Sequence, residues 1–96
     1  MNTISITNIE KMVISSMIFD STLFQNTILK SKDFQNPQNR KIFQIMENLH
    51  KKELPFDEDF ILKYIPENEK SLYEKTLIDI LSTNSMSEIR AYELEI

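Results

Sequence analysis

The chain contains no glycine among its 96 residues, and this absence limits what it can fold into. Glycine supplies the left-handed backbone of tight two-residue β-hairpins and of the loops that cradle phosphates. An average chain of this length would contain about seven glycines. The sequence therefore predicts helices joined by irregular loops, and it argues against nucleotide sites of the P-loop or dinucleotide type.

The length and composition are those of one small globular domain. Ninety-six residues fit a single domain, and 41% hydrophobic with 27% charged residues is typical of soluble domains. There is no cysteine, which excludes disulfides and thiolate metal sites and suits a reducing cytosol. The longest apolar run, Met12 to Ile14, is far too short to cross a bilayer, and no signal peptide is recognisable.

The charge is unevenly divided along the chain. Residues 1–52 carry seven Lys/Arg and four Asp/Glu, a net +3, whereas residues 53–96 carry four and eleven, a net −7; together they give −4. The isoelectric point near 4.9 argues against a duplex-DNA-binding domain, which usually has a basic face and a high isoelectric point. The division could orient one protein on another. Solvated helix faces without a partner are the alternative.

The first third of the chain predicts a flexible arm and two helices. Residues 1–8 have no helical period, and Asn8 can cap a helix that begins at residue 9. Asp20 and Ser21 combine an end signal with a start signal, so a second short helix should run to about Lys30. The apolar positions at helical spacing are Ile9, Met12, Val13, Met17, Phe19, Leu23, Phe24 and Ile28.

The clearest predicted helix covers residues 37–52. Asn36 can cap it, and Pro37 is tolerated at the first helical position. Its one-sided apolar stripe consists of Ile42, Phe43, Ile45, Met46 and Leu49. Phe34 lies just before the start, in position to fold back as an apolar anchor.

Three further helices are predicted in the second half. Asp57 can cap a short helix that Pro66 ends after residue 65. Another helical stripe consists of Leu72, Tyr73, Thr76, Leu77, Ile80 and Leu81. Ser85 with Glu88 matches a capping box for a last helix. The predicted fold class is all-α, a compact orthogonal or irregular bundle of about six short helices, with a globular head over residues 9–86.

No pattern of residues predicts catalysis, and we assign no catalytic, cofactor-binding or metal-binding residue. His50 is the only histidine, and a structural role at or near the surface suits it best. Asp57, Glu58 and Asp59 are adjacent at a helix start, where they complement the helix dipole better than they would surround a metal. Arg40 is expected to pair with Asp33 or Glu47, although contact with a phosphate is an alternative.

The order of these signals resembles the N-terminal domain of bacterial replicative DNA helicases, the DnaB family. The match covers about residues 8–96. The matching residues are Ile9-Glu10, Val13-Ile14-Ser15-Ser16, Met17-Ile18-Phe19-Asp20, Asp33-Phe34, Pro37, Arg40, Ile42-Phe43, Leu49, Pro55-Phe56-Asp57 and Ile89 with Tyr92. The chain departs from the family pattern at Ser15 and Glu53, where glycine is usual, and at Asn39, where histidine is usual. The change at Ser15 implies slightly looser helix packing, and the change at Asn39 removes a side chain from the helix-capping neighbourhood.

The resemblance implies a role as well as a fold. It implies the collar domain of a hexameric helicase, which assembles subunits and recruits primase and helicase loaders in the bacterial cytoplasm, at the nucleoid-associated replisome. ATP, magnesium and DNA unwinding would belong to a C-terminal domain absent here, so this fragment is expected to catalyse nothing and to bind no DNA directly. Residues 87–96 would begin a helix that leads to a missing hairpin, leaving a monomer or weak dimer. The alternatives are the helicase-binding C-terminal domain of primase and a generic helical interaction domain.

Overall fold

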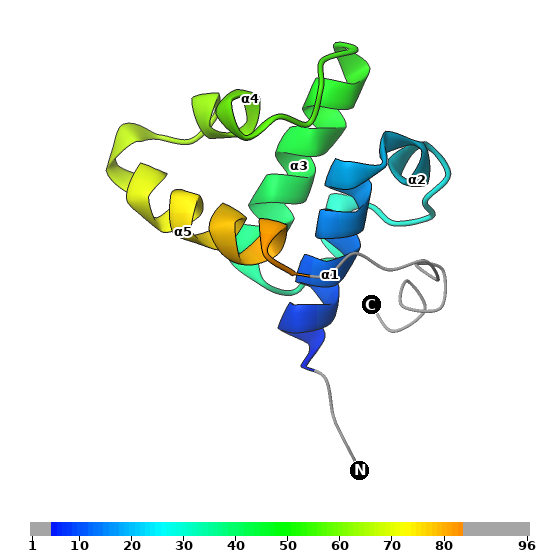
Figure 1. Cartoon of the computed structure of the whole chain (residues 1–96), viewed down its shortest axis with the longest axis horizontal. Coiled ribbons are helices and arrows are strands. Elements are labelled where there is room, and N and C mark those ends of the chain that lie inside the picture. Colours follow the sequence, from blue (N-terminus) through cyan, green and yellow to red (C-terminus); the bar gives the residue numbers. More distant parts are fainter. Residues whose placement is uncertain (1–4, 84–96) are drawn as a thin grey trace.

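The structure, a computed structural model, describes residues 5–83. Within this range the chain is all-α and forms no strand. Its elements are α1 (Ile6–Phe19), α2 (Ser21–Gln25), η1 (Ser31–Asp33), α3 (Pro37–Lys51), α4 (Glu58–Lys63), η2 (Glu67–Glu69) and α5 (Lys70–Leu81), where η marks a single 3-10 turn. The helices run in different directions around a common centre, as an irregular bundle does (Figure 1). The predicted fold class is confirmed, and the helix predicted after Ser85 lies outside the described residues.

The first helix begins earlier than predicted, and a different residue caps it. Helix α1 starts at Ile6, and the Ser5 hydroxyl accepts a hydrogen bond from the Asn8 backbone N–H at 3.2 Å. The predicted arm over residues 1–8 is therefore too long, and the prediction that Asn8 caps the first helix was wrong. Serine is as good a helix cap as asparagine, and Ser5 lies about one turn earlier. At the other end of α1, Phe19 is 63% exposed although the periodicity placed it on the apolar stripe.

The second helix is shorter than predicted. Helix α2 starts at the Asp20 cap but ends at Gln25, and Ile28 is 63% exposed in the loop that follows. The Asn26 side-chain amide donates to the Thr22 carbonyl, and the Thr27 hydroxyl accepts from the Leu29 N–H at 3.1 Å. Such side-chain bonds offer the backbone an alternative to continuing the helix. Leu29 rather than Ile28 fills the core.

Helix α3 confirms its predicted start and shows how a chain without glycine ends a helix. The Asn36 side chain accepts from the Asn39 N–H at 3.0 Å, with Pro37 in the first turn. At the other end the Glu53 N–H bonds to the His50 carbonyl, and the Leu54 N–H bonds to the Leu49 carbonyl. This bonding pattern needs a left-handed residue after the helix, a place that usually belongs to glycine. Glu53 takes it with φ of 58°.

The second half of the molecule packs two short helices against α3 and α1. Asp57 caps α4 by accepting from the Asp59 N–H at 2.8 Å, and α4 ends before Pro66, as predicted. Helix α5 buries Tyr73, Thr76, Leu77 and Ile80, whereas Leu72 is 48% exposed and does not belong to the buried stripe. The prediction that Leu72 belongs to the buried stripe of this helix was therefore wrong.

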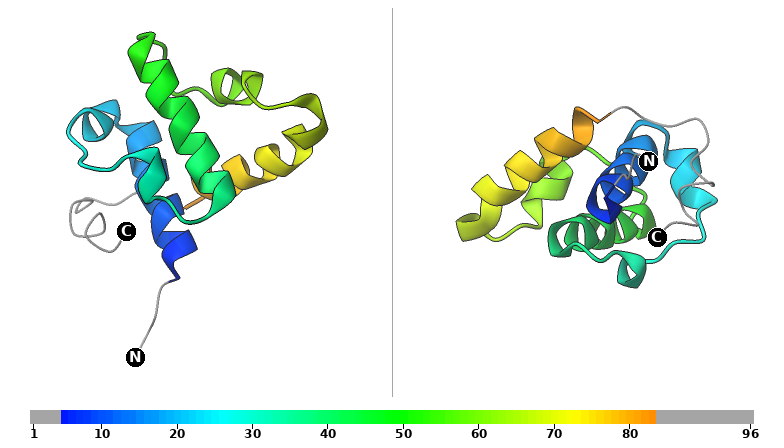
Figure 2. Two further views of the ribbon diagram at one scale, coloured as in Figure 1. Left: turned by 180° about the vertical axis from the view of Figure 1, so that it is seen from behind. Right: turned by 90° about the horizontal axis from the view of Figure 1, so that it is seen from below.

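The core is centred on a line of aromatic rings. The Phe34 ring lies 4.5 Å from the Phe43 ring, centroid to centroid; Phe43 lies 5.2 Å from Phe24, and Phe24 lies 4.9 Å from Phe56. Phe34 and Phe43 are fully buried, so the predicted anchoring role of Phe34 is confirmed. Both views of Figure 2 show α1 and α3 side by side around this core, with α5 crossing beside them.

A buried carboxylate joins α1 to the start of α3. Glu10 is fully buried, and its oxygens accept from the backbone N–H groups of Gln35 (2.6 Å) and Asn36 (3.2 Å) and from the Asn39 side-chain amide (3.1 Å). The Asn39 amide also donates to the Thr7 carbonyl at 3.3 Å. We call these contacts the Glu10 latch. A buried carboxylate with three donors is satisfied, and it fixes the angle between the two helices.

Two residues that depart from the family pattern are buried and make hydrogen bonds in the interior. Asn39 is buried in the Glu10 latch, so it supplies a contact near the helix cap where a loss was expected. Ser15 is also buried, and its hydroxyl donates to the Thr83 carbonyl at 3.2 Å. This hydrogen bond joins α1 to the chain just after the end of α5.

Candidate interaction surfaces

The described part of the chain contains no cluster of side chains that could hold a metal ion. Between residues 5 and 83, no group of three or more histidine, aspartate or glutamate side chains is placed to hold a metal ion. Asp57 is occupied as the cap of α4, and Glu58 and Asp59 lie in the first turn of that helix. In the same range no helix is both long and apolar enough to span a membrane.

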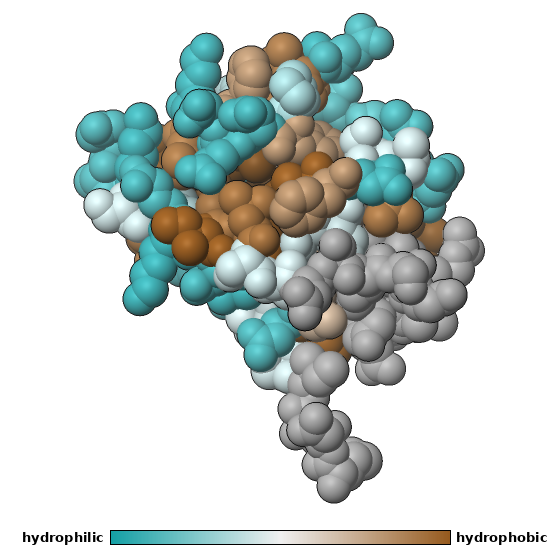
Figure 3. All heavy atoms as spheres, viewed as in Figure 1, coloured by the Kyte–Doolittle hydropathy of each residue, from teal (hydrophilic) through white to brown (hydrophobic). Residues whose placement is uncertain are grey.

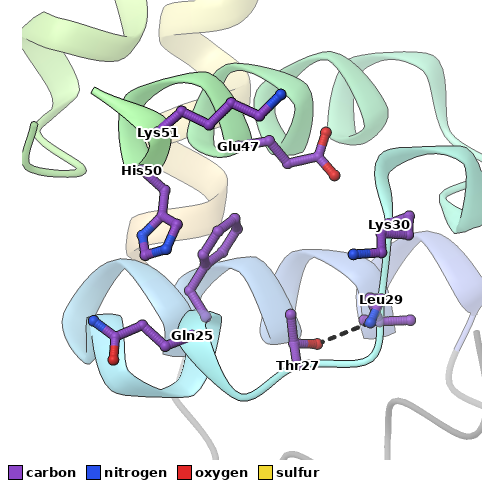
Figure 4. A pocket seen from close by; sticks show the side chains of 8 residues that line it. Gln25, Thr27, Leu29, Lys30, Glu47, His50 and Lys51 are labelled. Atoms are coloured by element: carbon purple, nitrogen blue, oxygen red, sulfur yellow. Dashed lines mark hydrogen bonds between the residues drawn. The ribbon is translucent and has the colours of Figure 1, made fainter. Parts of the chain in front are cut away.

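His50 lies at the surface, in the position predicted for a structural residue. Its ring is exposed and packs against Phe24 with 5.2 Å between centroids. It borders an open pocket of about 420 Å³ between the α2–η1 segment and α3 (Figure 4). The lining residues are Phe24, Gln25, Thr27, Leu29, Lys30, Glu47, His50 and Lys51. A second hollow shares Gln25 and His50 with the first.

Two polar side chains of this pocket are bonded to nearby backbone groups. In Figure 4 the Thr27 hydroxyl turns to the Leu29 backbone, away from the His50 ring. The Glu47 carboxylate accepts from the Ser31 N–H at 3.2 Å.

Arg40 does not make the predicted ion pair. Its Nε donates to the Phe34 carbonyl at 2.9 Å, and the structure pairs it with neither Asp33 nor Glu47. The Asp33 carboxylate instead accepts from the Lys30 N–H at 2.8 Å. Both acids are thus bound to backbone N–H groups of η1 or its flank, which leaves the cations around them without an acidic partner among the described residues.

The solvent side of α3, together with η1, forms a surface that we call the basic face. Its charged members are Lys30, Lys32, Arg40, Lys41, Lys51 and Lys52. On α3 these side chains recur at helical spacing opposite the buried stripe, with the amides of Gln44 and Asn48 between them. Sequence reasoning missed these two amides, although their spacing from Arg40 and Lys41 on one helix face would have revealed them.

The opposite charge collects in residues 53–83, which we call the acidic corner. These residues carry eight Asp/Glu and three Lys, a net −5, whereas residues 5–52 carry four and seven, a net +3. Apolar side chains are exposed beside these charges, among them Leu72 and Ile78 (60% exposed) on α5. Figure 3 shows apolar side chains gathered over α4 and α5, with hydrophilic side chains around them. An apolar centre with a charged rim is the usual anatomy of a protein-binding site.

Comparison with known proteins gives one consistent result. Residues 3–96 match the family described as the DnaB-like helicase N terminal domain. Two curated relatives are replicative DNA helicases DnaB from Helicobacter pylori strains 26695 and J99, which are 32% and 31% identical over 91 residues. These matches cover 93% of this chain but 18% of each relative, so the chain spans less than a fifth of their length.

The structural comparison agrees with the sequence comparison. A solved structure of the N-terminal domain of DnaB helicase from Helicobacter pylori, described together with its interactions with primase, superposes with a TM-score of 0.82 at 29% identity. The superposition covers 94% of this chain and 74% of that chain. The similarity in fold therefore extends over nearly the whole chain.

Proposed function

The chain belongs to the DnaB-like helicase N-terminal domain family, and on that premise we propose that it is the docking domain of a replicative DNA helicase, with primase as its partner. The observation that carries the proposal is the 0.82 TM-score to a domain described with its interactions with primase. The described residues support a docking role, because they combine a closed interior with an apolar surface that has a charged rim.

The same premise extends to the parent protein. ATP hydrolysis and DNA unwinding would reside in a region outside these 96 residues, and this domain would contribute no catalytic step. The parent would be a hexamer in the bacterial cytoplasm in which these domains form a collar, help to assemble the subunits and receive helicase loaders. The division of charge between the basic face and the acidic corner supports such a role, because complementary charges orient protein partners and speed their encounter.

A calorimetric titration of this chain with the C-terminal domain of the primase from the same bacterium tests the proposal. We expect saturable binding that weakens as salt is added, because charged rims are screened by salt. Single reversals on each surface, Lys51→Glu on the basic face and Glu74→Lys on the acidic corner, should show which surface the primase contacts, since only one of them should weaken binding strongly. A folded chain that releases no heat and shows no saturation would contradict the proposal.

A further inference from the structure

We propose that residues 86–96 form a helix that lies back on the domain and covers the exposed side of α1 around Phe19. The sequence predicts a helix in this segment, and the family resemblance has it lead away from the domain towards a hairpin. The contacts at the end of the described chain favour a course along α1 instead. This contact is internal to the chain and does not depend on primase.

The surface to be covered lies at the end of α1. Phe19 is 63% exposed there, and the adjacent Ile18 is only partly buried. A single exposed phenylalanine needs no explanation by itself. Its position does, because Phe19 lies one helical turn beyond Ser15 on the same side of α1, and Ser15 is fully buried. One side of α1 therefore changes from covered to exposed within a single turn.

The last turn of α5 and the residues just after it cover this side of α1 as far as Ser15. Asp79 pairs with Lys11 at 3.6 Å, and the Thr83 carbonyl accepts from the Ser15 hydroxyl at 3.2 Å. Figure 1 shows α5 ending beside α1. Each contact is four residues after the previous one on both segments, so the two segments advance together in the same direction. A further step of the same length brings the chain beside Phe19.

The distances suit this course. The four residues from Ser15 to Phe19 correspond to about 6 Å along the axis of α1. The two peptide steps from Thr83 to Ser85 can span about 7 Å when they are extended. Ser85 with Glu88 matches a capping box, so the predicted helix begins at residue 86. Its first turn therefore falls beside Phe19.

The segment carries an apolar side that suits the exposed ring. Ile89, Tyr92 and Ile96 recur at spacings of three and four residues, which places them on one side of a helix, whereas Leu94 lies on another side. A helix as short as residues 86–96 is marginal in water by itself, so it is stabilised by a surface that buries its apolar side. The ring of Phe19 is the nearest large exposed apolar group along the course described above.

A segment of the same chain is favoured over other occupants of this surface. Its attachment at Thr83 gives it an effective concentration near Phe19 on the order of millimolar. A second copy or a separate protein lacks this advantage and also loses translational and rotational freedom when it binds. The contact would fix the direction in which the chain continues beyond α5.

Nuclear magnetic resonance of the 96-residue chain tests the inference directly. Isotopically labelled protein at low concentration should show nuclear Overhauser effects between the Phe19 ring and the side chain of Ile89 or Tyr92. In an equimolar mixture of labelled and unlabelled chains, an isotope-filtered spectrum should show no such effects between molecules. Dispersed amide signals from the core show that the chain and each variant remain folded.

Hydrogen exchange of the backbone amides gives a second readout, with matched controls. Phe19→Ala should speed exchange at residues 90–96 about tenfold, because the buried part of a phenylalanine side chain stabilises by about that factor. Leu72→Ala, which truncates an exposed apolar residue at the far end of α5, should leave this exchange unchanged. Within the segment, Ile89→Ala should act like Phe19→Ala, whereas Leu94→Ala should have a much smaller effect.

Three results would overturn the inference. In the first, residues 90–96 of the wild-type chain exchange as fast as an unstructured peptide. In the second, the Overhauser effects arise only between molecules, which makes a second copy the occupant. In the third, Phe19→Ala weakens the binding of the primase C-terminal domain but leaves the exchange unchanged, which makes primase the occupant. Primase binding is measured separately, so each of these results can occur while the proposed function stands.

Discussion

Residues 5–52 and the acidic corner are held together in different ways. In the first region, contacts between residues distant in sequence are buried or partly buried and come in groups: the Glu10 carboxylate alone accepts three hydrogen bonds. The acidic corner is joined to that region by apolar packing and by single polar contacts. Apart from the backbone bonds at the end of α3, these polar contacts include the Lys11–Asp79 ion pair at 3.6 Å, the Lys52–Tyr64 hydrogen bond and the Ser15–Thr83 hydrogen bond.

The two regions also differ in how many buried hydrophobic residues and how many acidic residues they contain. Residues 5–52 hold twelve of the buried hydrophobic residues, against five in residues 53–83. The acidic corner instead holds eight acidic side chains, against four in residues 5–52. A well-packed region that supports a charged region with fewer buried residues suits a domain whose function is contact with other proteins.

The largest effect is expected from truncating the aromatic centre of the first region. Phe43→Ala should lower the free energy of unfolding by about 3–5 kcal/mol, because Phe43 is fully buried between Phe34 and Phe24. Urea denaturation followed by circular dichroism measures the change. His50→Ala, at the exposed edge of the same ring cluster, is the control and should be nearly silent. A stable Phe43→Ala protein would show that the core is assigned wrongly.

Breaking the Glu10 latch should have the next largest effect. Glu10→Ala leaves three donors without their acceptor in a buried site and should cost about 2–4 kcal/mol. Glu10→Gln keeps one acceptor oxygen and should cost less. The same urea experiment compares both variants with wild type. Equal stability of the Ala variant and wild type would remove the latch from the account and weaken the contrast between the two regions.

A gain of stability is expected where the two regions join. Glu53→Gly should raise the free energy of unfolding by about 1 kcal/mol, because glycine adopts the observed φ of 58° without the steric cost of a Cβ. Glu53→Ala keeps the Cβ and serves as the matched control, with little or no gain. Thermal melts of the three proteins rank them. If alanine stabilises as much as glycine, the gain comes from removing a carboxylate at the edge of the acidic corner.

The ion pair between the regions should contribute little. Lys11→Ala should cost less than about 1 kcal/mol, since the two side chains are 22% and 52% exposed. Urea denaturation at low and high salt is the measurement, and the difference from wild type should shrink as salt screens the pair. A cost as large as that of Glu10→Ala would mean that the acidic corner is fixed as firmly as the rest.

The smallest effect concerns high pH and belongs to the acidic corner. Burial, with the nearby charge of Glu69 as a second cause, raises the pKa of Tyr73 above its ordinary value of 10.0. The native state therefore holds this proton at a pH where the unfolded chain has lost it, and stability should fall as the pH rises past about 10. Tyr73→Phe should make the unfolding free energy less sensitive to pH in this range. An unchanged pH profile would contradict the assignment.

Signals within a few residues of one another were readable in the sequence. Asn36 followed by Pro37, Asp57 before α4, and Pro66 after it mark helix ends through contacts that span three residues or fewer, and the structure confirms all three. The apolar stripe of α3 is confirmed for the same reason, since one helix determines its own period.

Features that depend on distant partners were not readable. Periodicity placed Phe19 and Leu72 on buried stripes, but neighbouring elements leave both side chains exposed. No neighbouring residue in the sequence predicts the burial of Glu10, because its partners lie 25 or more residues away. The charge count from the sequence did predict that the two halves of the chain carry opposite net charges. Only the fold brings Lys41 of α3 and Tyr64 at the end of α4 to the same surface depression.

The central claim is that this domain acts through its exterior while its interior stays unchanged. Amide chemical shifts of the isotopically labelled chain, followed during titration with the primase C-terminal domain, test this claim most directly. The account predicts saturable shifts confined to exposed positions of the basic face or the acidic corner, with the amides around Phe34 and Phe43 unmoved. Shifts spread through the aromatic core, or no saturable shift at any amide of the folded chain, would contradict it.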